Sequence, residues 1–255
     1  MARRVSKKAW DNYTKRLEAQ RLEAYSDAYE WVMRHGNGLN IRRMMVETSI
    51  YHGRSTSALA ATWFDQMALA EGANVVKAVP INDAPQIRAR RMATASNMAM
   101  PKLLAGDKEG FAKAIASAVA ADVKRQATNT VMLNAQRAGA EYAWIPGGGE
   151  TCAFCIALAS NGWQPASKAT ALGNHADHIH DNCMCEFAIR FDKSTQYSSF
   201  DADKYADLYK DADGRSSEDK INSIRRDLYA ENGDKIREQH RERYAAMHST
   251  SDGGE

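Results

Sequence analysis

Apolar residues recur at intervals of three and four over long stretches of the chain, and this spacing predicts several helices. The first predicted helix covers residues 5–35, and Gly36-Asn37-Gly38 ends it because these residue types favour turns. Its apolar residues are Trp10, Tyr13, Leu17, Leu22, Tyr25, Tyr29 and Val32. We therefore expect a long helix at the start of the chain.

Two shorter helices are expected next, separated by a break at His52-Gly53. Ser55 or Thr56 can cap the second of these helices, and Gly72 ends it. The apolar residues are Ile41, Met44, Met45 and Ile50 in the first helix and Leu59, Trp63, Met67 and Ala70 in the second. We expect these two apolar faces to pack on each other as a helical hairpin.

A connector and another helix follow this hairpin. We interpret residues 72–82 (GANVVKAVPIN), around Pro80, as the connector. Asp83 can cap the next helix, with Pro85 tolerated in its first turn. This helix should run to about residue 100, where Pro101 kinks or ends it.

The next predicted helix covers about residues 108–138, and two short strands come after it. Lys124 and Arg125 lie in the middle of this helix, where we expect them to be solvated. Residues 141–145 and 185–191 are the strand candidates, because they are β-prone or alternate between faces. Two short strands form a small unit that needs a staple or a supporting helix to be stable.

The C-terminal region is polar, with helices expected near residues 201–213 and 217–244 and a disordered end. A thin apolar stripe on the second helix favours an arm that docks on a partner. The expected fold class is mainly α, with an elongated helical body and a small α+β Cys/His-rich subdomain. The expected divisions are a basic N-terminal helix (1–38), the helical body (39–139), the Cys/His-rich subdomain with two short strands (140–191) and a charged helical C-terminal arm (192–255).

The composition argues against a polycationic, membrane-spanning or secreted protein. The chain has 44% hydrophobic and 26% charged residues and a net charge of +2, so it is not a polycation as a whole. It contains no long apolar run, and its basic start lacks the apolar stretch of a secretory signal. We therefore expect no membrane association, and thiols that stay reduced in a cytosol.

Basic residues gather in the first part of the first helix. They are Arg3, Arg4, Lys7, Lys8, Lys15, Arg16 and Arg21, set against Asp11 and Glu18. One interpretation is a segment that contacts DNA or an acidic partner. The other interpretation is the solvated face of an ordinary helix.

All four cysteines lie in one stretch with several histidines, as Cys152-x-x-Cys155 and Cys183-x-Cys185. Two cysteines in a C-x-x-C element can reach one tetrahedral ion from a single turn. His180 stands three residues before Cys183 and adds a further donor. Cys152, Cys155, His180, Cys183 and Cys185 are therefore five candidates for the four places of a structural zinc site.

Other interpretations of this stretch stay open. The thiols can instead be buried as small hydrophobic side chains, or form disulfides. A metal-dependent nuclease or hydrolase is the enzymatic alternative, because His175 and His178 stand beside the cluster. Such an enzyme requires an open coordination position on the metal. No catalytic residue can be named from the pattern, so we expect a protein that is not an enzyme.

The order of these motifs resembles the phage Mu F-like minor head proteins, in the branch found in phages of actinobacteria. The resemblance covers roughly residues 39–191. An upstream helical segment, residues 57–65 (SALAATWFD), is similar to one in the same branch. The residues that carry the resemblance are 144–146 (WIP), 151–155 (TCAFC), 158–160 (LAS), Gly162 and 180–185 (HDNCMC).

The resemblance implies a structural role in the head of a tailed phage, in assembly and in DNA packaging or delivery. The implied partners are the portal protein and the major capsid protein, with packaged DNA reached through the basic N-terminal helix. Such proteins sit in the virion head in few copies, and we expect the copies to be oligomeric there. Assembly would take place in the host cytoplasm.

Overall fold

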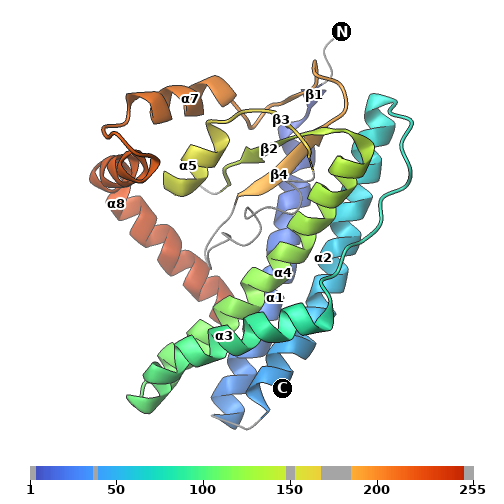
Figure 1. Cartoon of the computed structure of the whole chain (residues 1–255). Helices are drawn as coiled ribbons and strands as arrows, with labels where there is room; N and C mark the ends of the chain where they lie inside the picture. The colour runs from blue at the N-terminus through green and yellow to red at the C-terminus, as the bar shows by residue number, and fades with distance from the viewer. Residues whose placement is uncertain (1–3, 37–39, 148–152, 168–184, 250–255) are drawn as a thin grey trace.

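The computed structural model describes residues 4–36, 40–147, 153–167 and 185–249. Within these ranges the chain is mainly helical with a small sheet, as the sequence predicted. Figure 1 shows the long helices as one body, with the strands near one end and the C-terminal helices beside it. The long helices of the body are α1 (Lys7–His35), α2 (Ile41–Glu71), α3 (Pro85–Leu104) and α4 (Lys108–Ala138).

Helix α4 lies at the centre of the body and contacts the other three long helices. Residues 119–128 are all buried, which is more than two full turns, so this stretch has no solvent-facing side. Alanine is frequent there, and its small side chain lets helices approach on every side. The prediction that Lys124 and Arg125 are solvated is therefore wrong: their residues are 5% and 9% exposed.

Helix α1 is part of the core. Its Trp10, Tyr13 and Leu17 belong to the hydrophobic cluster that joins the body to the sheet. The rings of Tyr13 and Trp63 stack with their centroids 4.7 Å apart, which links α1 to α2. A second cluster, formed by α1, α2, α3 and α4, includes Met45. The predicted division of the chain at residue 38 stays a prediction.

Helix α2 is continuous where the sequence predicted two helices and a hairpin, so that prediction is wrong. Gly53 is buried inside the helix, and a Cβ atom placed on it would lie 3.0 Å from Cγ of Gln126 in α4. Its role is therefore to allow α2 and α4 to approach closely. Glycine lowers helix propensity by about 1 kcal/mol relative to alanine, a cost that tertiary packing outweighs here.

The predicted connector is an extended segment, which we call the strap. Polar side chains of α4 form hydrogen bonds with its backbone. Gln126, Thr130 and Asn134 bond the backbone of Asp83, Ile81 and Val79, respectively. Four helical residues rise about 6 Å, and two extended residues span about 6.6 Å. Polar residues every fourth position on α4 therefore match alternate residues of the strap.

The predicted fourth helix is α3, but both of its ends differ from the prediction. It begins at Pro85 after Ala84, and the Asp83 side chain does not cap it. Asp83 instead accepts hydrogen bonds from Arg91 and from Nδ2 of Asn129, at 3.1 Å in the second case. Pro101 lies inside the helix, which continues to Leu104 because a proline removes a single backbone donor.

The sheet confirms both predicted strands. It has the order β3-β2-β4 and is antiparallel, with Tyr142 opposite Ile189 and Ile145 opposite Glu186. The last four residues of β2 and the first four of β4 are buried, because α4 packs against both strands and α5 packs against β2. The strands are β2 (Glu141–Ile145), β3 (Gln164–Pro165) and β4 (Glu186–Arg190), and α5 is Ala153–Ala159.

Helix α7 and the start of α8 lie at the sheet end of the molecule, and α8 then runs back toward the long helices, as Figure 1 shows. Ile224 packs in a small cluster with Ala153 and Ile156 of α5. Tyr205 and Tyr209 pack against the same cluster. The remaining elements are α7 (Ala202–Asp211), α8 (Ser217–Ser249) and a parallel pair of short strands, β1 (Arg4–Val5) and β5 (Gln196–Tyr197).

Candidate functional site

Two of the five predicted metal ligands lie within the described residues. Cys155 in α5 and Cys185 directly before β4 are 1% and 2% exposed, and both belong to the hydrophobic cluster at the sheet. The other three candidates, Cys152, His180 and Cys183, lie outside the described residues. The same holds for the two neighbouring histidines at positions 175 and 178.

The two cysteines come from different elements but belong to the same hydrophobic cluster at the sheet. Ile145 ends β2 opposite Glu186, so Cys185 lies one position beyond the last pair of the ladder. Helix α5 packs against β2 and carries Cys155 on its buried side. Both thiols therefore belong to the same end of the sheet.

The chemistry of these two residues fits a structural zinc site. Zinc takes thiolate sulfur and imidazole nitrogen as ligands, and in structural sites four protein ligands fill all of its coordination positions. Two buried thiols at one sheet end are compatible with half of such a set. Among the described residues alone, no group of three or more His, Cys, Asp or Glu side chains could hold a metal.

A buried ion pair fixes the backbone beside Cys185. Nζ of Lys124 in α4 donates to the carbonyl oxygen of Cys185 at 2.6 Å and to Oε1 of Glu186 at 2.7 Å. The Lys124 side chain is 4% exposed and that of Glu186 is 11% exposed. The central helix thus holds the start of β4 through charge and hydrogen bonding together.

Sequence reasoning missed this pair, because it treated a charged residue in the middle of a helix as solvated. A usable signal was present in the small residues on all sides of Lys124. Ala120, Ala121 and Ala127 leave no broad polar face on which the lysine could sit. A lysine in such a surrounding requires a buried partner.

Tyrosine side chains surround the same sheet end. Burial raises the pKa of Tyr13 well above its usual value, and the carboxylate of Glu186 raises it further. Burial also raises the pKa of Tyr205, with smaller contributions from Cys185 and Asp201. Both phenols therefore keep their protons at neutral pH and can donate hydrogen bonds.

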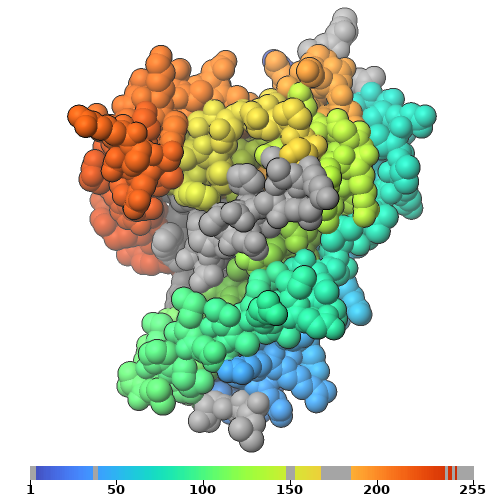
Figure 2. All heavy atoms as spheres, in the orientation of Figure 1, coloured from blue at the N-terminus to red at the C-terminus, as the bar shows by residue number. Residues whose placement is uncertain are grey.

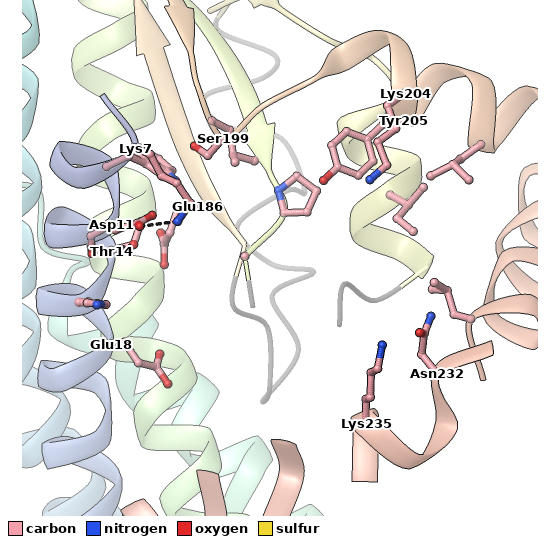
Figure 3. Close-up of a pocket in the computed structure, with 18 residues that line it drawn as sticks. Lys7, Asp11, Thr14, Glu18, Glu186, Ser199, Lys204, Tyr205, Asn232 and Lys235 are labelled. Carbon is pink, nitrogen blue, oxygen red and sulfur yellow. Dashed lines mark hydrogen bonds and ion pairs between the residues drawn. The ribbon is translucent and has the colours of Figure 1, made fainter. Parts of the chain in front are cut away.

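A pocket of about 790 Å³ opens beside the Lys124–Glu186 pair. Its walls come from α1, the ends of β2 and β4, α5, α7 and α8, as Figure 3 shows. Glu186 lines it from the sheet, Tyr205 from α7 and Lys235 from α8. We call this cavity the lysine pocket, because lysines line it from α1, α7 and α8.

A second cluster of charges lies on the other side of α4, and we call it the Asp122 cluster: Ser49, Asp83, Arg88, Arg91, Asp122 and Gln126. Asp122 is fully buried and accepts hydrogen bonds from Nε of Arg88 at 3.0 Å and from Nε of Arg91 at 2.9 Å. Ser49 donates to the same carboxylate. Arg91 also pairs with Asp83.

The hydrogen bonds of the Asp122 cluster join elements of the fold. Each of its carboxylates has at least two donors from other elements, so neither is available as a base or a ligand. Burial raises the pKa of Asp83, but the hydrogen bond and charge of Arg91 outweigh it and the net pKa is lowered. The cluster joins α2, α3, α4 and the strap.

Comparison with known proteins places the chain in a family. No helix in the described ranges combines the length and apolar character that a membrane span requires. Comparison with curated proteins and with solved structures gives no match. A family model described as VG15 protein matches residues 4–212, which are 209 of the 255 residues and include the sheet, both described cysteines and α7. The chain therefore belongs to the VG15 protein family, a family of viral proteins.

Proposed function

We propose that this protein is a structural minor head protein of a tailed phage, acting in head assembly and in DNA packaging or delivery. The observation that carries the proposal is the VG15 match, which spans the helical body and the sheet. The Cys/His motif order and its resemblance to Mu F-like minor head proteins support it from the sequence. We propose no catalytic role for the chain.

The proposed partners are the portal protein and the major capsid protein. Apolar side chains stand exposed on the body and suit contacts with other proteins: Leu69 is 83%, Met98 77% and Leu104 81% exposed. Helix α3, which carries Met98 and Leu104, lies at the surface in Figure 2. Several copies of the chain would associate in the particle.

Contact with packaged DNA is proposed through α1. Lys7 and Arg21 form ion pairs with Asp11 and Glu18, at 2.6 Å in both cases, so those two basic residues are already neutralised. Exposed lysines and arginines such as Arg16 would make the contact. Such a contact weakens as salt rises, because counterions are released when it forms.

A structural zinc ion is proposed for the sheet end. Four of the five candidates Cys152, Cys155, His180, Cys183 and Cys185 would hold it. Both described candidates, Cys155 and Cys185, are buried cysteines, the ligand type that structural zinc sites use most. Elemental analysis of the reduced protein should give about one zinc per chain, as one four-ligand site requires. A folded protein without metal would contradict this part of the proposal.

The proposed role is tested by co-sedimentation with assembled particles. Procapsids are assembled from the major capsid protein of the same phage, with and without its portal protein, and mixed with the full chain. We expect the chain to sediment with the particles, and more of it when the portal is present. If the chain stays in the supernatant with both kinds of particle, the proposed partners are wrong.

A further inference from the structure

The lysine pocket contains more positive charge than its surroundings neutralise. Among the described residues that line it, the three acidic side chains all have cationic partners: Asp11 with Lys7, Glu18 with Arg21 and Glu186 with Lys124. Three further lysines line the pocket, and none of them forms an ion pair within the described residues. They are Lys15, Lys204 and Lys235, one each from α1, α7 and α8.

The three lysines line one pocket from three different helices. Figure 3 shows Lys204 and Lys235 at opposite sides of the pocket, with Asn232 beside Lys235 and Tyr205 beside Lys204. Like charges around a concave surface raise the local concentration of anions. The remaining polar atoms suit an anion as well, since the phenol of Tyr205 stays protonated.

An unsatisfied hydroxyl points to the same conclusion. Oγ of Ser199 is buried and has no hydrogen-bond partner among the described residues, although Ser199 lines the pocket. A buried hydroxyl without a partner is uncommon in folded proteins and costs free energy. A carboxylate bound in the pocket could accept a hydrogen bond from it.

Apolar side chains form the rest of the wall and favour a peptide over nucleic acid. Ile145, Ile156 and Leu228 line the pocket between the charged groups. A duplex presents mainly phosphate and sugar on its outside, which gives these side chains nothing apolar to contact. A volume of about 790 Å³ lies within the range of ligand-binding pockets and is large enough for several side chains of a peptide.

We infer that the lysine pocket binds an acidic segment of another protein, with carboxylates on Lys15, Lys204 and Lys235 and apolar side chains between them. Part of this site lies beyond the VG15 match, which ends at residue 212. Helix α8 supplies Leu228, Asn232 and Lys235 to it. The inference does not depend on the proposed role in the phage head.

Fluorescence polarisation with the full chain tests the inference. The probe is a labelled six-residue peptide that alternates aspartate or glutamate with leucine, and the control probe has asparagine or glutamine at the acidic positions. We expect the acidic peptide to bind and the neutral peptide to bind at least about tenfold more weakly, since the three ion pairs with the lysines are lost.

Matched variants locate the binding. The double variant Lys204→Ala and Lys235→Ala should weaken binding of the acidic peptide about tenfold. The double variant Lys210→Ala and Arg226→Ala removes the same charge from the same two helices but outside the pocket, and should leave binding unchanged. An excess of 20-base-pair duplex should fail to displace the peptide.

Three results would overturn the inference. They are no binding of the acidic peptide, an equal loss in the two double variants, or displacement of the peptide by duplex DNA. The second result would mean that binding follows net charge alone, and the third would mean that the pocket recognises phosphate.

Discussion

The Asp122 cluster and the lysine pocket lie on different sides of α4, and both contain several charged side chains. In the Asp122 cluster the carboxylate of Asp122 is bonded by Ser49, Arg88 and Arg91, and the residue is 0% exposed. In the lysine pocket, Lys204 and Lys235 are exposed and form no ion pair within the described residues. The charged side chains of the Asp122 cluster are paired with one another, whereas Lys204 and Lys235 of the lysine pocket can still pair with a ligand.

This difference separates stability from binding. Charges that are buried and paired hold elements together, and removing one partner leaves the other buried without compensation. Exposed, unpaired charges contribute little to stability, so changing them affects binding first. Substitutions in the Asp122 cluster should therefore lower stability, and substitutions in the lysine pocket should lower binding with little change in stability.

The largest expected effect is in the Asp122 cluster. Asp122→Asn keeps the shape but leaves Arg88 and Arg91 without their shared charge, so it should lower the free energy of unfolding by about 3–5 kcal/mol. Urea unfolding followed by circular dichroism measures this. Asp213→Asn, at an exposed position, is the control and should change stability by less than about 0.5 kcal/mol. A similar small change in both variants would contradict the assignment.

The next effect is in the Lys124–Glu186 pair. Lys124→Met leaves the Glu186 carboxylate and the Cys185 carbonyl without their donor, so we expect a loss of about 3 kcal/mol. The control is Lys113→Met on the same helix, whose pair with Glu109 is exposed and should contribute about 0.5 kcal/mol at most. Equal losses from the two variants would show that Lys124 is not held as described.

A pH series gives a smaller and more specific effect. The folded-state pKa of Asp83 is lowered below its ordinary value, so its ionised form stabilises the fold above the unfolded pKa. Asp83→Asn should cost about 2 kcal/mol at pH 7, as expected for hydrogen bonds to a charged group. The difference from the wild type should shrink as the pH falls below about 4 and through the folded pKa. A difference that grows towards low pH would reverse the sign and exclude this explanation.

The smallest effect on stability is expected in the lysine pocket. Lys204→Ala and Lys235→Ala should each change the free energy of unfolding by less than about 0.5 kcal/mol, since neither lysine has an ion-pair partner to lose among the described residues. Thermal unfolding followed by circular dichroism is sufficient. A clear loss would mean that these lysines support the fold, and the contrast with the Asp122 cluster would fail.

Much of the fold follows from the local sequence pattern. Helical periodicity predicted α1, and the break at Gly106-Asp107 followed by a helix-favouring composition predicted α4. A β-prone segment predicted β2, and alternation between faces predicted β4. Helix α1 and strand β4 are predictable because one side chain after another obeys the same spacing rule. The failures share a cause, which is tertiary contact. Gly53 looks like a helix breaker in sequence, but it lies inside a continuous helix at the place where α2 passes close to Gln126 of α4.

The candidate sites were harder to predict. The cysteines were found because C-x-x-C and C-x-C spacings are visible in one line of sequence. The lysine pocket combines residues more than two hundred positions apart, such as Lys7 and Lys235, and no local pattern relates them. The Asp122 cluster likewise joins Ser49 to Asp122. Both depend on how helices cross, which the periodicity of one helix does not specify.

The proposed role in the phage head is tested most directly by the protein content of the particle. DNA-filled heads of the phage that encodes this chain are purified by density gradient, and quantitative mass spectrometry compares the chain with the major capsid and portal proteins. We predict that the chain is present in every preparation, in far fewer copies than the capsid protein. Its absence from both filled heads and procapsids, with abundant protein left in the infected-cell lysate, would contradict a structural role in the head.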